Sequence, residues 1–128
     1  MFLKQLTLGA LKTNCYILAC TQAKEAVVID PAENDKRILK ILEKDRFRLK
    51  YIINTHGHAD HIGGNAFLKE HTNARLLIHT NDKDMLGDSK RNLSFYMNFA
   101  IQSPPADDFL VENKKINIGN LDIAIVHT

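Results

Sequence analysis

The side chains most able to do chemistry gather in one short segment near the middle of the chain. Residues 55–65 read T-H-G-H-A-D-H-I-G-G-N, so that His56, His58, Asp60 and His61 fall within six residues. Imidazole nitrogens and carboxylate oxygens are the ligands that zinc and similar transition metals bind in proteins. Three histidines and an aspartate at this density predict a metal site, and they suggest one side of a site for two ions.

The spacing divides these four side chains into two pairs. His56 and His58 are two residues apart, so they project to the same side of an extended backbone and can bind one ion. Asp60 and His61 follow after a turn and are better placed to bind a second ion, because two-metal hydrolytic sites hold their ions about 3.5–4 Å apart. Gly57 lets the loop fold tightly between the first two ligands.

Four other possible ligands receive a structural interpretation. His71 and His79 lie apart from the cluster, and we expect each to be a hydrogen-bonded polar residue. Cys15 and Cys20 are five positions apart in a predicted strand, so they face opposite sides of it and neither pair nor share a metal readily. Burial as small hydrophobic side chains is favoured over a C-x4-C metal pair.

The hydrophobic pattern predicts strands on both sides of the cluster. Residues 2–7, 14–20 and 26–30 read as strands, an amphipathic helix capped by Asn34 or Asp35 follows, and 49–53 reads as the next strand. The strand, helix, strand order makes a crossover unit, so the histidines follow the carboxyl end of a sheet strand. Open α/β sheets place their ligands at that edge.

Past the cluster the pattern changes from regular to irregular and back. Gly63 and Gly64 allow a helix through about His71 to approach closely, 75–79 reads as a strand, and Asn81 or Asp82 can cap a short helix. Residues 87–110 show no periodicity and are aromatic-rich, which suits a lid or pocket wall as well as core packing. A hairpin turning at Gly119-Asn120 is predicted over 114–118 and 121–126.

Composition bounds the class of protein. The 128 residues are 45% hydrophobic and 25% charged, which is typical of a single globular domain. The net charge of +2 comes from charges scattered along the chain, so nucleic acid is not an expected partner. The sequence contains no apolar run as long as a signal peptide core or a membrane span, and we therefore expect a cytoplasmic protein.

These motifs together resemble the metallo-β-lactamase-fold superfamily. Its signature H-x-H-x-D-H is matched by His56, His58, Asp60 and His61, and the surrounding segment is similar to the glyoxalase II (hydroxyacylglutathione hydrolase) branch. T-N-C-Y-I-L and V-V-I-D-P near the amino terminus add to the match. The resemblance implies an α/β fold, the four-layer αββα sandwich, of which residues 1–128 would form a partial domain, the first half and the start of the second.

The resemblance also implies a mechanism and its ligands. One zinc ion would be held by His56 and His58 and a second by Asp60 and His61, with a bridging hydroxide that Asp60 orients for attack on a carbonyl; iron or manganese could replace zinc. The family runs on into H-T-P-G-H, and this chain matches only His127-Thr128, so it resembles a truncated domain that lacks the later ligands. His127 is a weak substitute because its family counterpart belongs to a strand end.

Three functions remain open on this sequence. The favoured one is a metal-dependent hydrolase of small-molecule thioesters or esters. The second is a non-catalytic fragment or subunit that oligomerises or needs a complementing C-terminal half. The third is a mononuclear iron dioxygenase acting on glutathione persulfide, a reaction that the superfamily also includes.

Overall fold

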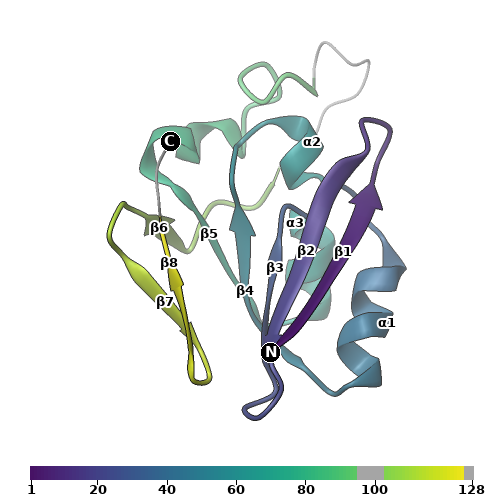
Figure 1. Cartoon of the computed structure of the whole chain (residues 1–128). Coiled ribbons are helices and arrows are strands. Elements are labelled where there is room, and N and C mark those ends of the chain that lie inside the picture. Colours follow the sequence, from purple (N-terminus) through teal and green to yellow (C-terminus); the bar gives the residue numbers. More distant parts are fainter. Residues whose placement is uncertain (95–102, 126–128) are drawn as a thin grey trace.

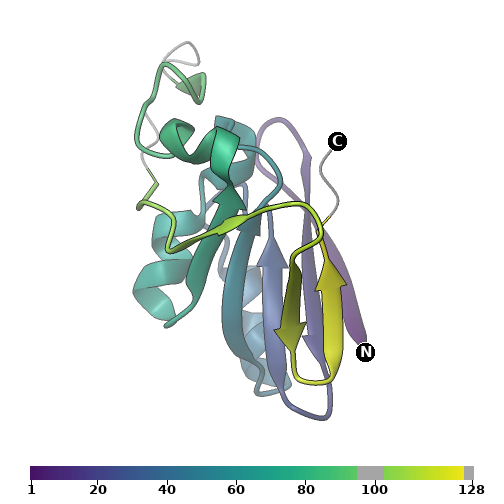
Figure 2. The same ribbon diagram turned by 90° about the vertical axis from the view of Figure 1, so that its left-hand side faces the viewer.

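A computed structural model describes residues 1–94 and 103–125. Its strands form one six-stranded sheet in the order β1-β2-β3-β4-β5-β6 and one two-stranded sheet, β7-β8. Helices cover one face of the larger sheet, and the β7-β8 hairpin lies on the other (Figures 1 and 2). The α/β class predicted from the sequence is confirmed.

The chain opens with an antiparallel meander. β1 (Phe2–Leu8) pairs with β2 (Thr13–Cys20), which pairs with β3 (Glu25–Ile29). All three predicted strands are confirmed, with ends shifted by one residue. β3 is buried on both faces, because Val28 packs in the core under the helices while Val27 packs in the core under the hairpin.

A helical crossover connection then adds parallel strands to the sheet. α1 (Lys36–Lys44) connects β3 to β4 (Arg48–Asn54), and these two strands run parallel. Asp35 is the cap, since its Oδ1 accepts the Arg37 N–H at 2.8 Å. Ile38 and Leu42 on the apolar side of α1 are buried in the core.

The segment after β4 contains one more helix than the sequence predicts. α2 (Ala59–Ile62) carries Asp60 and His61, and α3 (Asn65–His71) follows it directly. β5 (Arg75–His79) then pairs parallel to β4. A four-residue helix is too short to show a hydrophobic period, so the pattern could only predict a turn there.

Two predictions after β5 need correction. The short helix is the 3₁₀ helix η1 (Thr80–Met85), and its cap is His79, whose Nδ1 accepts the Asn81 N–H, in place of the predicted Asn81 or Asp82. The span predicted to be irregular ends in a strand, β6 (Asp108–Leu110), which pairs parallel to β5. Residues 95–102, which hold most of the aromatic side chains of that span, lie outside the described part of the chain.

The predicted hairpin is confirmed over its described length. β7 (Lys115–Ile118) and β8 (Leu121–Ala124) pair antiparallel around Gly119 and Asn120. Gly119 has a φ of 59°, the left-handed conformation that a two-residue hairpin turn requires. Ile116 and Ile118 of β7 bury against the sheet.

The described residues contain no membrane-spanning helix. None of the helices within 1–94 and 103–125 has the length and apolar character needed to cross a bilayer.

Candidate metal centre

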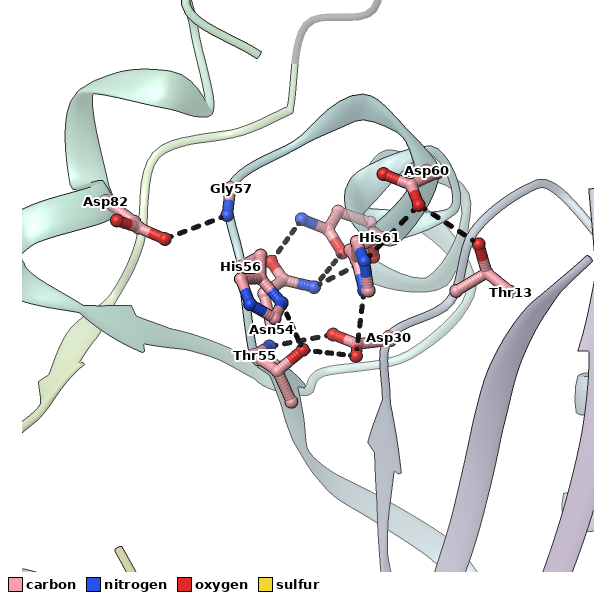
Figure 3. A network of polar contacts seen from close by, with 10 residues as sticks. Thr13, Asp30, Asn54, Thr55, His56, Gly57, Asp60, His61 and Asp82 are labelled. Atoms are coloured by element: carbon pink, nitrogen blue, oxygen red, sulfur yellow. Dashed lines mark hydrogen bonds and ion pairs between the residues drawn. The ribbon is translucent and has the colours of Figure 1, made fainter. Parts of the chain in front are cut away.

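The histidine cluster lies at one edge of the six-stranded sheet, where three parallel strands end. Asp30 follows β3, the segment from Asn54 to His61 follows β4, and Asp82 lies in η1, which follows β5. Figure 3 shows these side chains converging from the three connections. The expected position past the carboxyl end of a strand is therefore what the structure has.

The rings of the three histidines are close neighbours. The ring centroids of His56 and His58 are 6.2 Å apart with nearly parallel planes, and those of His56 and His61 are 4.9 Å apart. Asp60 Oδ2 lies 3.4 Å from His61 Nε2. The structure thus brings together all four residues that the sequence predicts as ligands.

The side chains of the cluster are of the types that bind transition metals. Their arrangement supplies part of a coordination shell. Imidazole and carboxylate are the side chains that zinc and iron sites use. Within the described residues, however, no three His, Cys, Asp or Glu side chains are arranged to hold one ion. A catalytic zinc commonly has three protein ligands, so the described residues supply an incomplete set.

Asp30, which no spacing in the sequence connects to the cluster, contacts it from the end of β3. It is buried, and its carboxylate accepts two hydrogen bonds from Thr55, from the main-chain N–H at 2.7 Å and from the hydroxyl at 2.5 Å. The Thr55 hydroxyl oxygen also lies 3.0 Å from His56 Nδ1. Asp30 therefore fixes the start of the segment that carries the histidines, residues 55–61. Through the Thr55 hydroxyl it also fixes the ring of His56.

Asp30 also controls the second half of the cluster. Its Oδ2 lies 3.0 Å from His61 Nδ1, which is an ion-pair distance, although this buried nitrogen has no aligned hydrogen-bond acceptor within the described residues. The pKa of His61 is raised above its ordinary value, mainly by this side-chain contact with Asp30, while burial of the ring opposes the shift. A carboxylate beside Nδ1 leaves Nε2, which faces Asp60, as the nitrogen that would bind a metal.

A residue from the amino-terminal meander touches the predicted catalytic carboxylate. The hydroxyl of Thr13, at the start of β2, lies 3.4 Å from Asp60 Oδ2 and is oriented to donate to it. Asp60 is thus contacted by Thr13 on one side and by His61 on the other. Its orientation depends on an element far from it in sequence.

The loop between the first two histidines is packed against η1. The Gly57 N–H donates to Asp82 Oδ2 at 3.2 Å. A Cβ added at Gly57 would lie 2.6 Å from the Cβ of Met85, so a larger residue would push η1 away. The structure thus requires glycine at position 57 because the loop lies against η1, while a tight fold of the loop between the two histidines stays a prediction.

Buried amides and close-packed glycines hold α2 and α3 in place. The side chains of Asn54 and Asn65 are hydrogen-bonded to each other in both directions, and Asn54 also donates to the carbonyl of His61. A Cβ added at Gly63 would lie 2.1 Å from the carbonyl oxygen of Ala32. The predicted close approach after the cluster is therefore confirmed.

The other possible ligands lie elsewhere in the fold. His71 Nδ1 is 2.8 Å from the carbonyl oxygen of Phe67, and His79 caps η1, so both have the structural roles predicted for them. Cys15 and Cys20 are free and buried. Burial raises the pKa of the Cys15 thiol to about 12, so it behaves as a small apolar residue. His127 lies outside the described residues.

The fold and the cluster agree with a known family. The Metallo-beta-lactamase superfamily profile matches residues 8–128, and this chain belongs to that superfamily. The hydroxyacylglutathione hydrolase of Pelagibacter ubique is 46% identical over 77 residues, which cover 59% of this chain and 32% of that enzyme.

Solved structures give the same result. The BLEG-1 B3 metallo-beta-lactamase is 29% identical with a TM-score of 0.88, covering 99% of this chain and 61% of its own. TTHA1623 in a di-iron-bound form is 26% identical with a TM-score of 0.72, and the match covers 88% of this chain and 56% of the TTHA1623 chain. The chain spans between about a third and three fifths of the length of the curated relatives compared with it.

Proposed function

We propose that this chain carries one side of a metal-dependent hydrolase centre that acts on thioesters. The observation that carries the proposal is the convergence of His56, His58, Asp60 and His61 at the carboxyl end of β4, supported by Asp30. Similarity to a hydroxyacylglutathione hydrolase supports a hydroxyacyl thioester of glutathione as the substrate class.

Each residue has a distinct role in this proposal. His56 and His58 hold one ion, and Asp60 and His61 hold a second. Bound ions supply a low pKa for coordinated water and polarise a carbonyl oxygen. Asp60 orients the attacking water, and Asp30 keeps the His61 ring fixed through its contact with Nδ1.

Zinc is the proposed metal, with two ions in the complete site. Iron or manganese are the alternatives, since the same imidazole and carboxylate donors bind all three. A single iron ion together with oxygen consumption would instead favour a persulfide dioxygenase.

The proposed partner is a complementing C-terminal half of the domain. Apolar side chains on the hairpin side of the large sheet and on β8 stay only partly buried; we call them the uncovered apolar face, and they are Leu18, Ile29, Tyr51, Leu121, Ile123 and Ile125. The chain covers 60% of one relative and 61% of the BLEG-1 structure, and we propose that a further segment of the domain covers this face and supplies the remaining metal ligands. Without it, the chain is a non-catalytic subunit.

Metal analysis of the wild-type chain tests the function. About two zinc ions per chain with turnover of an S-acyl glutathione support the hydrolase. Little metal and no turnover, both restored by adding the complementing half, support the subunit interpretation.

We also propose a cytoplasmic location, in keeping with two free thiols and a reducing compartment. Cell fractionation tests it.

The variant His58→Ala tests the ligand assignment. It is expected to lose the bound metal, because a two-ligand half-site cannot hold an ion with one histidine. His71→Ala is the matched control, since His71 bonds to the Phe67 carbonyl away from the cluster and its loss leaves the metal content unchanged. The comparison is made under the condition in which the wild type binds metal, with the complementing half added where it is needed, and equal metal content in His58→Ala would then refute the assignment.

A further inference from the structure

The short helix α2 is held at both ends by residues outside it. It has only four residues, and so short a helix leaves most of its main-chain groups without partners inside the helix. At its start, the Ala59 N–H donates to the main-chain carbonyl of Asn92 at 2.7 Å. Near its end, the carbonyl of His61 accepts from the side-chain amide of Asn54 at 3.2 Å. The positions of Asp60 and His61 therefore depend on residues that are not proposed as ligands.

Asn54 is one member of a buried pair of amides. Asn54 and Asn65 both have 0% exposure. Asn65 Nδ2 donates to Asn54 Oδ1 at 2.7 Å, and Asn54 Nδ2 donates back to Asn65 Oδ1 at 3.1 Å. Each side chain then has one N–H left, because a primary amide carries two donors. Asn54 donates its second N–H to the His61 carbonyl. Asn65 donates its second N–H to the hydroxyl oxygen of Ser103 at 2.9 Å.

Ser103 gives this chain of hydrogen bonds its direction. Its hydroxyl donates to the carbonyl of Pro104 at 2.8 Å, so its oxygen acts as an acceptor toward Asn65. Asn65 therefore turns an N–H toward Ser103, and its carbonyl oxygen takes the N–H of Asn54. The other N–H of Asn54 then faces the His61 carbonyl. With both amides reversed, the side-chain oxygen of Asn54 would face the carbonyl oxygen of His61, and no proton would lie between these two acceptors.

The main chain of Ser103 is itself held in place. Its N–H donates at 2.7 Å to the carbonyl of Leu86, a buried residue at the end of η1. The same 3₁₀ helix contacts the histidine segment directly, where Asp82 accepts the Gly57 N–H. η1 thus supports the cluster by two routes, one direct and one through Ser103 and the amide pair.

We propose that Ser103 and Asn65 are positioning residues for the metal cluster. Together they fix the orientation of the Asn54 amide, and that amide fixes the main chain at His61. Apolar side chains of similar volume could fill the same space without needing partners, so the amides are explained by the orientation that they impose. The ligand role of His61 rests on the proposed function, whereas the chain of hydrogen bonds does not.

Nuclear magnetic resonance of the metal-free full chain tests the inference without relying on metal binding. Ser103→Ala removes the acceptor, so the amide pair is free to reverse. The side-chain amide protons of Asn54 are then expected to exchange faster with solvent, and the carbonyl carbon resonance of His61 is expected to shift because its donor is lost. A His61 carbonyl resonance that stays at its wild-type position overturns the proposal.

Two further variants separate the hydrogen bond from a general effect on packing. Ser103→Thr keeps the hydroxyl and is expected to keep the wild-type His61 resonance. Ser89→Ala is the matched control, since the main-chain carbonyl of Ser89, and not its hydroxyl, contacts Ser94. An equal shift in Ser89→Ala and Ser103→Ala would refute a specific role for Ser103. Ser103→Cys, whose sulfur is a weak acceptor, replaces Ser103→Ala if the latter does not fold.

Metal titration connects the hydrogen-bond chain to the ligands. It is made under the condition in which the wild type binds metal, with the complementing half added where it is needed. Ser103→Ala is expected to lower metal affinity about tenfold, and Ser103→Thr to keep it. Wild-type affinity in Ser103→Ala would refute the positioning role. A wild type that binds no metal under any condition would contradict the proposed function, and the metal-free measurement then decides this inference alone.

Discussion

Asp82 lies outside the histidine cluster, yet its carboxylate holds the main chain between two of the proposed ligands. Its Oδ2 accepts the Gly57 N–H, so η1 fixes the spacing of His56 and His58. Asp82→Asn is expected to speed hydrogen exchange at the Gly57 amide and to lower metal affinity about tenfold, because the supporting charge is lost. Amide exchange in the metal-free chain and metal titration measure the two effects.

The neighbouring Asp84 supplies the control for that prediction. Asp84 belongs to the same 3₁₀ helix, but it is exposed and pairs with Arg91. Asp84→Asn is expected to change neither the Gly57 exchange rate nor metal affinity. If the two variants behave alike, Asp82 has no special role in positioning the loop.

Gly63 carries a packing constraint of a different kind. An added Cβ would lie 2.1 Å from the carbonyl oxygen of Ala32, and a main-chain atom cannot move aside cheaply. Gly63→Ala is expected to lower the free energy of unfolding by about 1–3 kcal/mol or more through overpacking. Chemical denaturation measures this loss. Gly87→Ala, where the added Cβ meets no atom within 4 Å, should leave stability nearly unchanged, and an equal loss there would contradict the explanation.

The histidine cluster could be predicted from the sequence because its four side chains lie within six residues. Asp30, Thr13 and Asp82 could not, since each reaches the loop from a different element and no spacing connects them to it. Knowing that β3 and β4 are parallel neighbours would have placed Asp30 beside Thr55.

At the scale of elements, the β7-β8 hairpin is attached to the meander by polar contacts at its turn. Glu25 Oε1 accepts the Gly119 N–H at 2.7 Å, and Lys50 Nζ donates to the Asn117 carbonyl at 3.0 Å. Asn120 contacts the side chains of Gln22 and Cys20. The hairpin itself was predictable from Gly119-Asn120, but its docking site was not, because the partner residues are 67 to 100 positions away in sequence.

Acid is expected to loosen this hairpin. The pKa of Glu25 is lowered from 4.5, first because the Gly119 N–H donates to its charged form, with further lowering by Arg48 and Lys50 and opposition from burial. A carboxylate with a lowered folded-state pKa contributes stability above its unfolded pKa and loses it as the pH falls through the folded value. Protection factors of β7 and β8 amides should therefore fall below pH 4.5.

Glu25→Gln separates this carboxylate from the others. The variant is expected to show weaker protection of the hairpin at neutral pH and a smaller loss on acidification. Glu112→Gln, which changes an exposed carboxylate in the turn before β7, should keep the pH dependence of the wild type. An unchanged acid response in Glu25→Gln would show that another group controls the docking.

At the scale of the whole molecule, the fold is a mixed sheet with unequal cover on its two faces. The helices bury one face with a continuous core, while among residues 1–94 and 103–125 the other face is covered by the two-stranded sheet alone. The α/β class and the crossover were predictable from hydrophobic periodicity. The short strand β6 was not, because three residues cannot display an alternating pattern.

The uncovered apolar face makes a prediction for the chain on its own. Half-buried Leu121 and Ile123 lie on one side of β8 and Ile125 directly follows it, and contiguous apolar surface of this kind favours association. The isolated chain is expected to self-associate at high concentration or to melt at low temperature, and the complementing half should convert it to a 1:1 complex. Sedimentation velocity and calorimetry measure both properties. A monodisperse, monomeric, high-melting chain would contradict the prediction.

Introducing a charge into the uncovered apolar face distinguishes association through this face from nonspecific association. Ile123→Glu places a carboxylate in the uncovered apolar face and should reduce both self-association and binding of the complementing half, because the buried charge would lose its hydration. Lys115→Glu introduces the same side chain at an exposed position of β7 and should leave both unchanged. If both variants reduce association equally, net charge rather than this face controls it. If only Ile123→Glu reduces association, the uncovered apolar face is the surface that binds the complementing half. Binding there is then also required for the metal ligands of that half to reach His56, His58, Asp60 and His61.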